Sequence, residues 1–230
     1  MRRSKILNAI NWRHAIGELL LIVVGILIAL QASDWQNRRV DRQTEIAYLE
    51  EIRTSLSTDI DAVTAGIDRY RQLEIRITEL MSRLDAELPY ENSVDTFFGA
   101  VYGANAFSLN AAAYESLKSH GLTLISDRAL RSEIAMMYEL TYPDTQRAIR
   151  YEESTVLDIL RPYFLLHFRD LIFNKSATPI DYDFVANDTK FLNLANYRLQ
   201  LIRQNQIPIF ERAAAEMEKL IQALELELYE

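Results

Sequence analysis

The sequence of 230 residues contains no cysteine, only six glycines and only five prolines. The missing cysteine excludes disulfide bonds, thiol catalysis and thiolate metal sites. The scarcity of glycine and proline excludes a chain built from many tight turns, because these two residues are among the main formers of such turns. Leucine, alanine, glutamate, arginine and isoleucine are abundant instead. This composition predicts an ordered, mainly helical protein.

Sequence patterns that are typical of enzymes are also missing. There is no phosphate-binding glycine loop, no G-x-S-x-G motif and no EF-hand loop. None of the three histidines has a second histidine three or four residues away, which excludes a helical pair of metal ligands. We therefore expect a protein that is not an enzyme and that holds neither a metal ion nor a cofactor.

Two weaker groupings leave an envelope enzyme or a small-ligand-binding domain open as alternatives. His167 and Asp170 are three residues apart and would share one face of a helix. Asp181 and Asp183 form a D-x-D motif, a pattern that can bind a divalent cation through oxygen ligands. A ligand pocket could instead be lined by tyrosines, among which the sequence favours none: Tyr102, Tyr114 and Tyr151.

Charge is distributed unevenly along the chain. The formal net charge is −8, but residues 1–33 carry four basic residues against one acid, a sum of +3. The remaining residues therefore carry a net charge of −11. A domain this acidic is a poor partner for nucleic acid or for an anionic lipid surface, so we expect no nucleic acid among its partners.

A long apolar run predicts one transmembrane helix at residues 15–33. Its centre, residues 19–30, contains no polar side chain, and Glu18 and Gln31 flank that centre. A spanning helix needs at least about 17 residues, so by length alone a buried core helix is an alternative. A cleaved signal peptide is a second alternative, although residues 30–32 lack the small-x-small pattern of a cleavage site.

The two tryptophans, Trp12 and Trp35, bracket this run and favour membrane insertion. In a helix they would lie about 34 Å apart, which matches the spacing of the bilayer interfaces where tryptophan collects. We therefore expect both to act as interface anchors. Four basic residues precede the run and three follow it among acids. This slight bias predicts that the basic tail, residues 1–14, is cytoplasmic and that the C-terminal domain is extracytoplasmic.

Small and polar residues on the predicted membrane helix indicate a surface for helix association. Gly25 and Ala29 form a small-xxx-small pair, which lets two helices approach closely. Glu18 lies seven residues before Gly25, and Gln31 adds an amide at the far end. One interpretation makes Glu18 an interfacial cap in the first helical turn. A second makes these four residues the seam of an oligomer, and a third makes Glu18 part of an ion or proton channel.

A heptad pattern predicts a long helix over residues 34–88. Apolar residues recur there at steps of three and four. Their period and the length of the helix are typical of a coiled coil or of a bundle helix that continues from the membrane. Pro89 ends the segment. The residues that keep a strict seven-residue period are Leu49, Leu56, Val63, Tyr70, Ile77 and Leu84.

Prolines and polar clusters divide the rest of the chain into helices joined by loops. Short helices are expected within residues 92–120, and residues 174–187 are expected to form a loop. Two long helices, residues 126–173 and 188–229, contain prolines at which we expect kinks: Pro143, Pro162 and Pro208. The predicted fold is all-α, a single transmembrane helix followed by an elongated antiparallel helical bundle over residues 34–230.

Two blocks of sequence resemble an uncharacterised bacterial family of single-pass membrane proteins. The first block, "AIGE…GILIALQ…W", runs from Ala15 to Trp35. The second, "Y-x-x-L…G-L…LI-x-D-x-x-LR…Y", runs from Tyr114 to Tyr138. Next to Trp35 the family more often has asparagine than the aspartate and glutamine found here. The family is known only as a domain of unknown function, so the resemblance implies a bacterial membrane protein and no particular activity.

These patterns together lead to one functional expectation. We expect a non-enzymatic protein of the bacterial inner membrane, inserted in the lipid bilayer by one helix. It would act as a self-associating scaffold, a sensor or an accessory subunit of an envelope complex. Its expected partners are the bilayer, further copies of itself and an envelope protein. Self-association would use the membrane seam and the apolar stripe that follows it.

Overall fold

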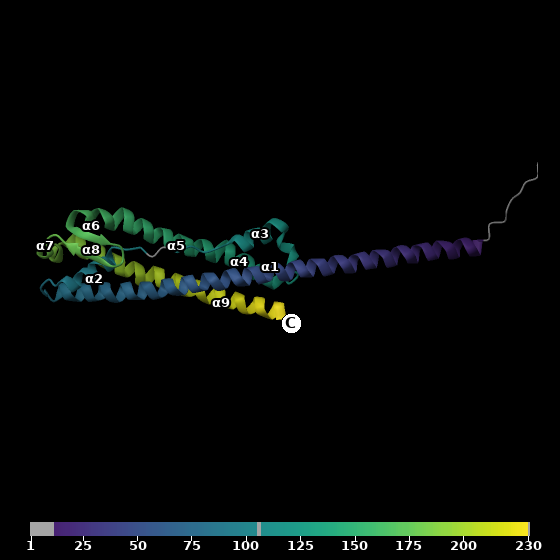
Figure 1. Cartoon of the computed structure of the whole chain (residues 1–230), viewed down its shortest axis with the longest axis horizontal. Helices are drawn as coiled ribbons and strands as arrows, with labels where there is room; N and C mark the ends of the chain where they lie inside the picture. The colour runs from purple at the N-terminus through teal and green to yellow at the C-terminus, as the bar shows by residue number, and fades with distance from the viewer. Residues whose placement is uncertain (1–11, 105–106, 230) are drawn as a thin grey trace, which may run out of the picture. The chain divides into compact units, whose positions relative to one another are not determined.

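The computed structural model describes residues 12–104 and 107–229, with side chains from residue 16 onward (Figure 1). The described part is all-α apart from one two-stranded hairpin, which confirms the predicted fold class. The chain divides into two compact units, Met1–Ala47 and Tyr48–Glu230, and each is described by itself. One helix, α1 (Trp12–Asp85), runs through the boundary between them.

The second unit follows α1 with short helices, two long helical stretches and the hairpin. Each long stretch contains π-helical segments (η3, η4 and η5) between α-helices, so helix continues over residues 128–167 and again over residues 189–229. The elements after α1 are η1 (Asn92–Val94), α2 (Asp95–Val101), α3 (Ala112–His120), η2 (Leu122–Leu124), α4 (Arg128–Met136), η3 (Met137–Thr141), α5 (Tyr142–Ser154), η4 (Thr155–Leu160), α6 (Arg161–His167), β1 (Phe168–Ile172), β2 (Ser176–Pro179), α7 (Tyr182–Asn187), α8 (Thr189–Leu201), η5 (Ile202–Gln206) and α9 (Ile207–Tyr229).

The apolar stripe of α1 is buried inside the second unit. The helices of the same chain cover it, so it is not available to another copy. The helix ends at Asp85, three residues before the predicted end, because Glu87 takes a positive φ of 51° and the Leu88 N–H bonds back to the Arg83 carbonyl at 3.1 Å. The buried stripe consists of Leu49, Ile52, Leu56, Val63, Ile67, Tyr70, Leu73, Ile77, Leu80 and Leu84.

The N-terminal part of α1 has the opposite character. The side chains of residues 16–40 are all exposed, including the apolar run predicted to cross the membrane. The most apolar stretch of the helix has a mean hydropathy of 2.2, and none of it is buried. Among the described residues, α1 is thus one helix that is long and apolar enough to span a bilayer.

The three prolines expected to kink the long helices instead follow π-helical turns. Pro143, Pro162 and Pro208 each stand two residues after a π segment, namely η3, η4 and η5. A proline ring clashes with the carbonyl four residues earlier and has no N–H to donate to it. A wider π turn relieves that conflict, so the helix passes each proline without breaking.

The second long helix ends earlier than predicted. Residues 168–172 do not continue it but form strand β1, which pairs antiparallel with β2 through Phe168 opposite Pro179 and Arg169 opposite Thr178. Residues 174–187, expected to be a loop, contain β2 and the short helix α7. Phe168, Leu171 and Phe173 are spaced by three residues and then by two, a step of each period, so the pattern did not distinguish helix from strand over so short a stretch.

The turn of this hairpin packs tightly against α2 and the segment after it. The Asn174 N–H donates to the Tyr102 carbonyl at 3.1 Å, and the Asn174 side-chain amide donates to the Ala104 carbonyl at 2.8 Å. Arg76 of α1 donates to the Asn174 carbonyl at 3.0 Å. A Cβ atom on Gly99 would lie 2.3 Å from the backbone nitrogen of Ser176, so only glycine fits there.

We expect Gly99→Ala to destabilise the helical domain, because the added methyl group meets backbone atoms that cannot move aside. The cost should be about 1–3 kcal/mol in the free energy of unfolding, measured by chemical denaturation of the full chain in detergent micelles. Gly25→Ala is the matched control, since nothing lies within 4 Å of a Cβ atom at Gly25. Equal stability of the two variants would contradict the close approach of the hairpin to α2.

Candidate functional site

The residues predicted to set helix association in the membrane all lie on the exposed part of α1. Glu18, Gly25, Ala29 and Gln31 are exposed, and a Cβ atom on Gly25 would touch nothing within 4 Å. Glu18, Gly25 and Ala29 share one side of the helix, whereas Gln31 lies on another, and both sides are open to another helix or to lipid. The structure brings them into no contact with one another beyond their shared helix, and it leaves their proposed association as a prediction.

Of the two expected interface anchors, one falls within the described side chains. Trp35 is 65% exposed, and the Arg39 guanidinium lies 5.8 Å from the centre of its ring. An exposed tryptophan beside a cation is the arrangement expected at a membrane interface. The side chain of Trp12 lies outside the part of the chain whose side chains are described.

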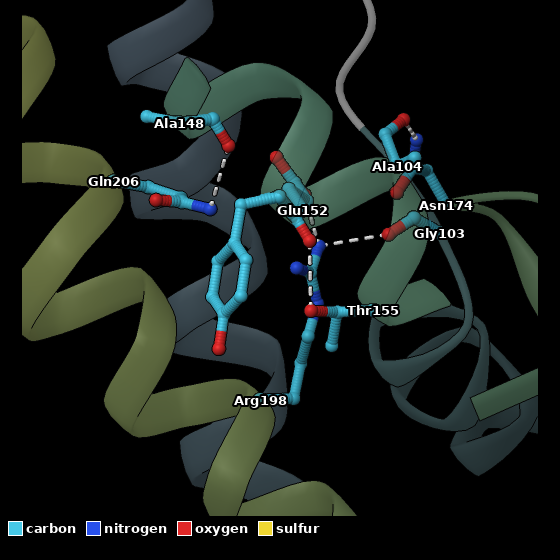
Figure 2. Close-up of polar contacts among 9 residues, drawn as sticks. Gly103, Ala104, Ala148, Glu152, Thr155, Asn174, Arg198 and Gln206 are labelled. Atoms are coloured by element: carbon cyan, nitrogen blue, oxygen red, sulfur yellow. Dashed lines mark hydrogen bonds and ion pairs between the residues drawn. The ribbon is translucent and has the colours of Figure 1, made fainter. Parts of the chain in front are cut away.

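A fully buried ion pair is the most unusual polar feature of the second unit. Arg198 on α8 donates from Nη2 to Oε1 of Glu152 on α5, and both side chains are at most 1% exposed. The same Nη2 donates to the Gly103 carbonyl at 2.7 Å, which connects the segment after α2 to the pair. Figure 2 shows these groups converging between α5, α8 and the loop that follows α2.

The surroundings of this pair are also polar but incompletely bonded. Gln206, at the end of η5, donates to the Ala148 carbonyl at 3.4 Å, and Thr155, at the start of η4, donates to the Tyr151 carbonyl at 2.8 Å (Figure 2). Among the described residues, Nε and Nη1 of Arg198 and Oε1 of Gln206 are buried without a hydrogen-bond partner. Burying polar groups without partners costs free energy of folding. Removing one member of the cluster would leave further polar atoms unpaired and lower the stability more.

The two π segments explain how these polar groups reach the interior. Glu152 lies three residues before η4, and Arg198 lies four residues before η5. A π turn adds a residue to the helix and shifts the side chains on either side of it around the axis. The arrangement connects three segments through one guanidinium group. The described contacts of this group therefore give it the role of a structural connection.

A second buried carboxylate lies on α1 within a row of tyrosines. Asp59, only 3% exposed, accepts from the Tyr142 hydroxyl at 2.6 Å and from the Asn110 N–H at 3.0 Å. Burial raises the pKa of Asp59 above its usual range, although these two hydrogen bonds act in the opposite direction. Burial also raises the pKa of Tyr138, which lies against Tyr142, to about 12.

Tyr114, one of the candidate pocket residues, continues this row instead of lining a pocket. Its ring stacks on Tyr138 with centres 4.7 Å apart, and its hydroxyl donates to Glu139 at 2.8 Å. Lys118 donates to the same Glu139 carboxylate at 2.9 Å. These hydrogen bonds, with Lys118 first, hold the pKa of Glu139 below its usual range. The row therefore packs α3 against the long helix of residues 128–167.

Tyr102 and Tyr151 have different surroundings. Tyr102 is buried and stacks between Phe164 and Phe173, with ring centres 4.9 and 4.6 Å away. Tyr151 is exposed and donates to or accepts from the Tyr197 hydroxyl at 2.8 Å. Of the three tyrosines that the sequence offered as pocket residues, Tyr151 lines a large cavity between α5 and α9.

That cavity, which we call the α5–α9 cleft, has a volume of about 740 Å³. One wall comes from α4, η3 and α5, and the other from η5 and α9. Its floor is apolar and its rim is charged. Its lining residues include Glu133, Met136, Met137, Leu140, Thr141, Asp144, Arg147, Ala148, Tyr151, Ile209, Arg212, Ala213, Glu216, Lys219 and Leu220.

The acidic and histidine candidates do not form a metal site in the described residues. His167 stacks on Phe184 with ring centres 5.0 Å apart, and Asp181 accepts from the Phe184 N–H at 3.0 Å as the cap of α7. Asp170 lies on β1 with a φ of 51°. No group of three histidine, aspartate or glutamate side chains there is placed to hold a metal ion. Asp181 thus has a capping role, and Asp183 lies in the first turn of α7.

The three buried charges among the described residues of the second unit were not identified from the sequence, although a signal was present. Arg198 follows Phe191 and Ala195 at steps of four and three, so it lies on an apolar stripe. Asp59 lies in the same way between Leu56 and Val63 on α1. A charged residue in phase with a buried stripe must find a partner inside the protein. Searching the stripes for such residues would have found Asp59, Glu152 and Arg198.

Comparisons with known proteins identify no relative of this chain: no protein-family model, no curated protein and no solved structure matches it.

We expect Glu152→Gln to destabilise the protein by about 3–5 kcal/mol, because it leaves the Arg198 guanidinium buried without a countercharge. Replacing both residues at once, Glu152→Leu with Arg198→Met, should recover most of that loss. Glu153→Gln changes an exposed neighbour and serves as the control. Chemical denaturation of the full chain in detergent measures all four proteins. A single variant as stable as the control would contradict this account of the pair.

The raised pKa of Asp59 predicts a pH dependence of stability. A carboxyl group whose pKa is higher in the folded state stabilises the fold below its unfolded pKa of about 4, and this contribution is lost as the pH rises through the folded pKa. The stability of the wild type relative to Asp59→Asn should therefore fall as the pH rises above about 4. Denaturation at a series of pH values measures it, with exposed Asp61→Asn as the control that should show no such trend.

Proposed function

We propose that the chain is a single-pass protein of the bacterial inner membrane, anchored by residues 15–33, whose helical domain acts as a self-associating scaffold or accessory subunit. One observation carries this proposal. Within the single helix α1, the apolar run near the N-terminus is wholly exposed, while the apolar stripe from Leu49 onward is buried. Water does not tolerate so long an exposed apolar surface, whereas a bilayer requires one.

The geometry of the exposed run supports association between membrane helices. Gly25 and Ala29 leave a shallow surface on one side of α1, with Glu18 at its N-terminal end and Gln31 near its other end but turned to another side of the helix. Small residues allow two helix backbones to pack closely, and polar groups in lipid gain from a partner on the second helix. A pair of such helices would shelter the Glu18 carboxylate from hydrocarbon.

The proposed orientation has the basic residues 1–14 in the cytoplasm and the helical domain outside it. The supporting observation is the excess of arginine and lysine before the apolar run. Reporter enzymes fused to each end of the full chain, one active only in the cytoplasm and one only outside it, test this directly. Cytoplasmic activity of the C-terminal fusion would overturn the orientation and move the search for partners to the other side of the membrane.

Gly25→Ile should weaken self-association about tenfold, equivalent to about 1.4 kcal/mol, because its branched side chain separates the helix backbones. Crosslinking in native membranes measures the effect through one cysteine introduced at Gln36, which is the only thiol because the chain has none of its own. Val23→Ile adds bulk on another side of the same helix and should change little. Undiminished crosslinking of Gly25→Ile would remove the seam.

A further inference from the structure

The α5–α9 cleft presents apolar surface that the chain itself leaves uncovered. Met136 and Leu140 on one wall are 57% and 61% exposed, and Tyr151 farther along the same wall is also exposed. Behind this ridge, the floor contains Met137, Ala148, Ala213 and Leu220, which are buried. A ridge of large apolar side chains beside an apolar floor is the form of a surface that receives another helix.

Three contacts fix how the two walls face each other. Lys219 donates to Glu133 at 2.9 Å, Thr141 donates to Glu216, and Gln206 donates to the Ala148 carbonyl at 3.4 Å. Residue numbers therefore rise along one wall as they fall along the other, and the walls are antiparallel.

At two levels these contacts bring an acid of one wall opposite a base of the other. Glu133 is level with Lys219. Asp144 lies between Thr141 and Ala148, so it is level with the stretch of the opposite wall that holds Arg212. At both levels the α4–α5 wall is acidic and the α9 wall is basic. Arg147 on the first wall and Glu216 on the second also line the cleft, and Asp144 pairs with Arg147 of its own helix at 2.9 Å in an exposed contact. Within the described part of the chain, Arg212 has no ion pair or hydrogen bond of its own.

We propose that the α5–α9 cleft binds the α5–α9 cleft of a second copy of this chain, around a two-fold axis that runs along the cleft. Such an axis keeps both copies at the same level and places the α4–α5 wall of each opposite the α9 wall of the other. The four walls form a helical bundle in which the ridges of Met136 and Leu140 are buried. Asp144 of each copy then pairs with Arg212 of the other.

Charge complementarity selects a second copy as the occupant. The acids Glu133 and Asp144 of one wall are matched in level by the bases Lys219 and Arg212 of the other, a property of the chain itself that requires no outside partner. Arg212 gains the countercharge that its own chain does not provide. The apolar stripe of α1 cannot serve for this contact, because it is already buried.

The inference deepens the proposed self-association and rests on the proposed membrane anchoring. The lining residues span 133–151 on one wall and 205–220 on the other. That is about 24–28 Å of helix, so the contact is modest in area. Two chains held in one membrane have a high effective concentration, and a modest contact is then sufficient to form. The seam at Gly25 and the cleft would be two independent contacts of one assembly.

Charge reversal in separate copies tests the pairing. Arg212→Glu places an acid opposite Asp144 in both halves of a dimer, and Asp144→Arg places a base opposite Arg212, so neither variant should associate with itself. Mixed together, one copy of each restores attraction at both positions. Full-length chains with two different tags are co-expressed in the Gly25→Ile background, which removes the seam, and capture of one tag by the other is measured after mild solubilisation.

We expect each single variant to be captured by itself at least tenfold less than the parent, and the mixed pair to recover to within about twofold of it. Recovery can come only from folded copies, so it excludes misfolding as the cause of the reduced capture of the single variants. Arg150→Glu, an exposed residue of α5 outside the cleft, should leave capture unchanged.

Two results would overturn the inference. The first is that the mixed pair is captured no better than the single variants, and the second is that the parent in the Gly25→Ile background is not captured at all. Either result leaves the membrane seam to be judged by crosslinking of the chain with Gly25 intact. The failure of the cleft and the failure of the proposed self-association are therefore distinguishable.

Discussion

The burial of one apolar stripe on α1 is the constraint on which the rest of the bundle depends. Both other long helices are held to α1 by contacts along its length. Tyr70 packs on Phe210 of α9 with ring centres 5.4 Å apart, and Asp59 accepts from Tyr142 of α5 at 2.6 Å. Ion pairs at the edges, such as Arg71 with Glu211 at 2.7 Å, add specificity of register more than stability, because they are exposed.

The polar interior follows from how the chain accommodates its prolines. Each long helix retains a π turn ahead of a proline, and the turns η4 and η5 flank the buried pair of Glu152 and Arg198. A regular helix would carry these side chains to other positions around its axis. The prolines therefore affect the interior as well as the local helix geometry. They accompany the π turns that allow the ion pair of Glu152 and Arg198 inside an otherwise apolar bundle. Removal of either charge is costly because the other remains buried.

Much of the fold could be predicted from periodicity, and the exceptions have physical reasons. The stripe of α1 was readable because it repeats over five heptads, from Leu49 to Leu84. The hairpin at residues 168–179 was not, because four or five residues cannot establish a period. In the candidate site, Gly25 and Trp35 were singled out from local sequence patterns. The cleft could not be, because it depends on which faces of α5 and α9 remain uncovered, and packing alone decides that.

The buried ion pair and the cleft are connected through α5. Glu152 fixes the position of α5 against α8 through Arg198, and one turn earlier Ala148 accepts from Gln206, where η5 leads into α9. These two contacts determine how far α5 is displaced along its axis relative to α9. Because a helix rises about 1.5 Å per residue, a slip of one turn, about 5.4 Å, would remove Asp144 from the level of Arg212. A costly buried charge pair is thus a means of holding the walls in the alignment that a second copy would need.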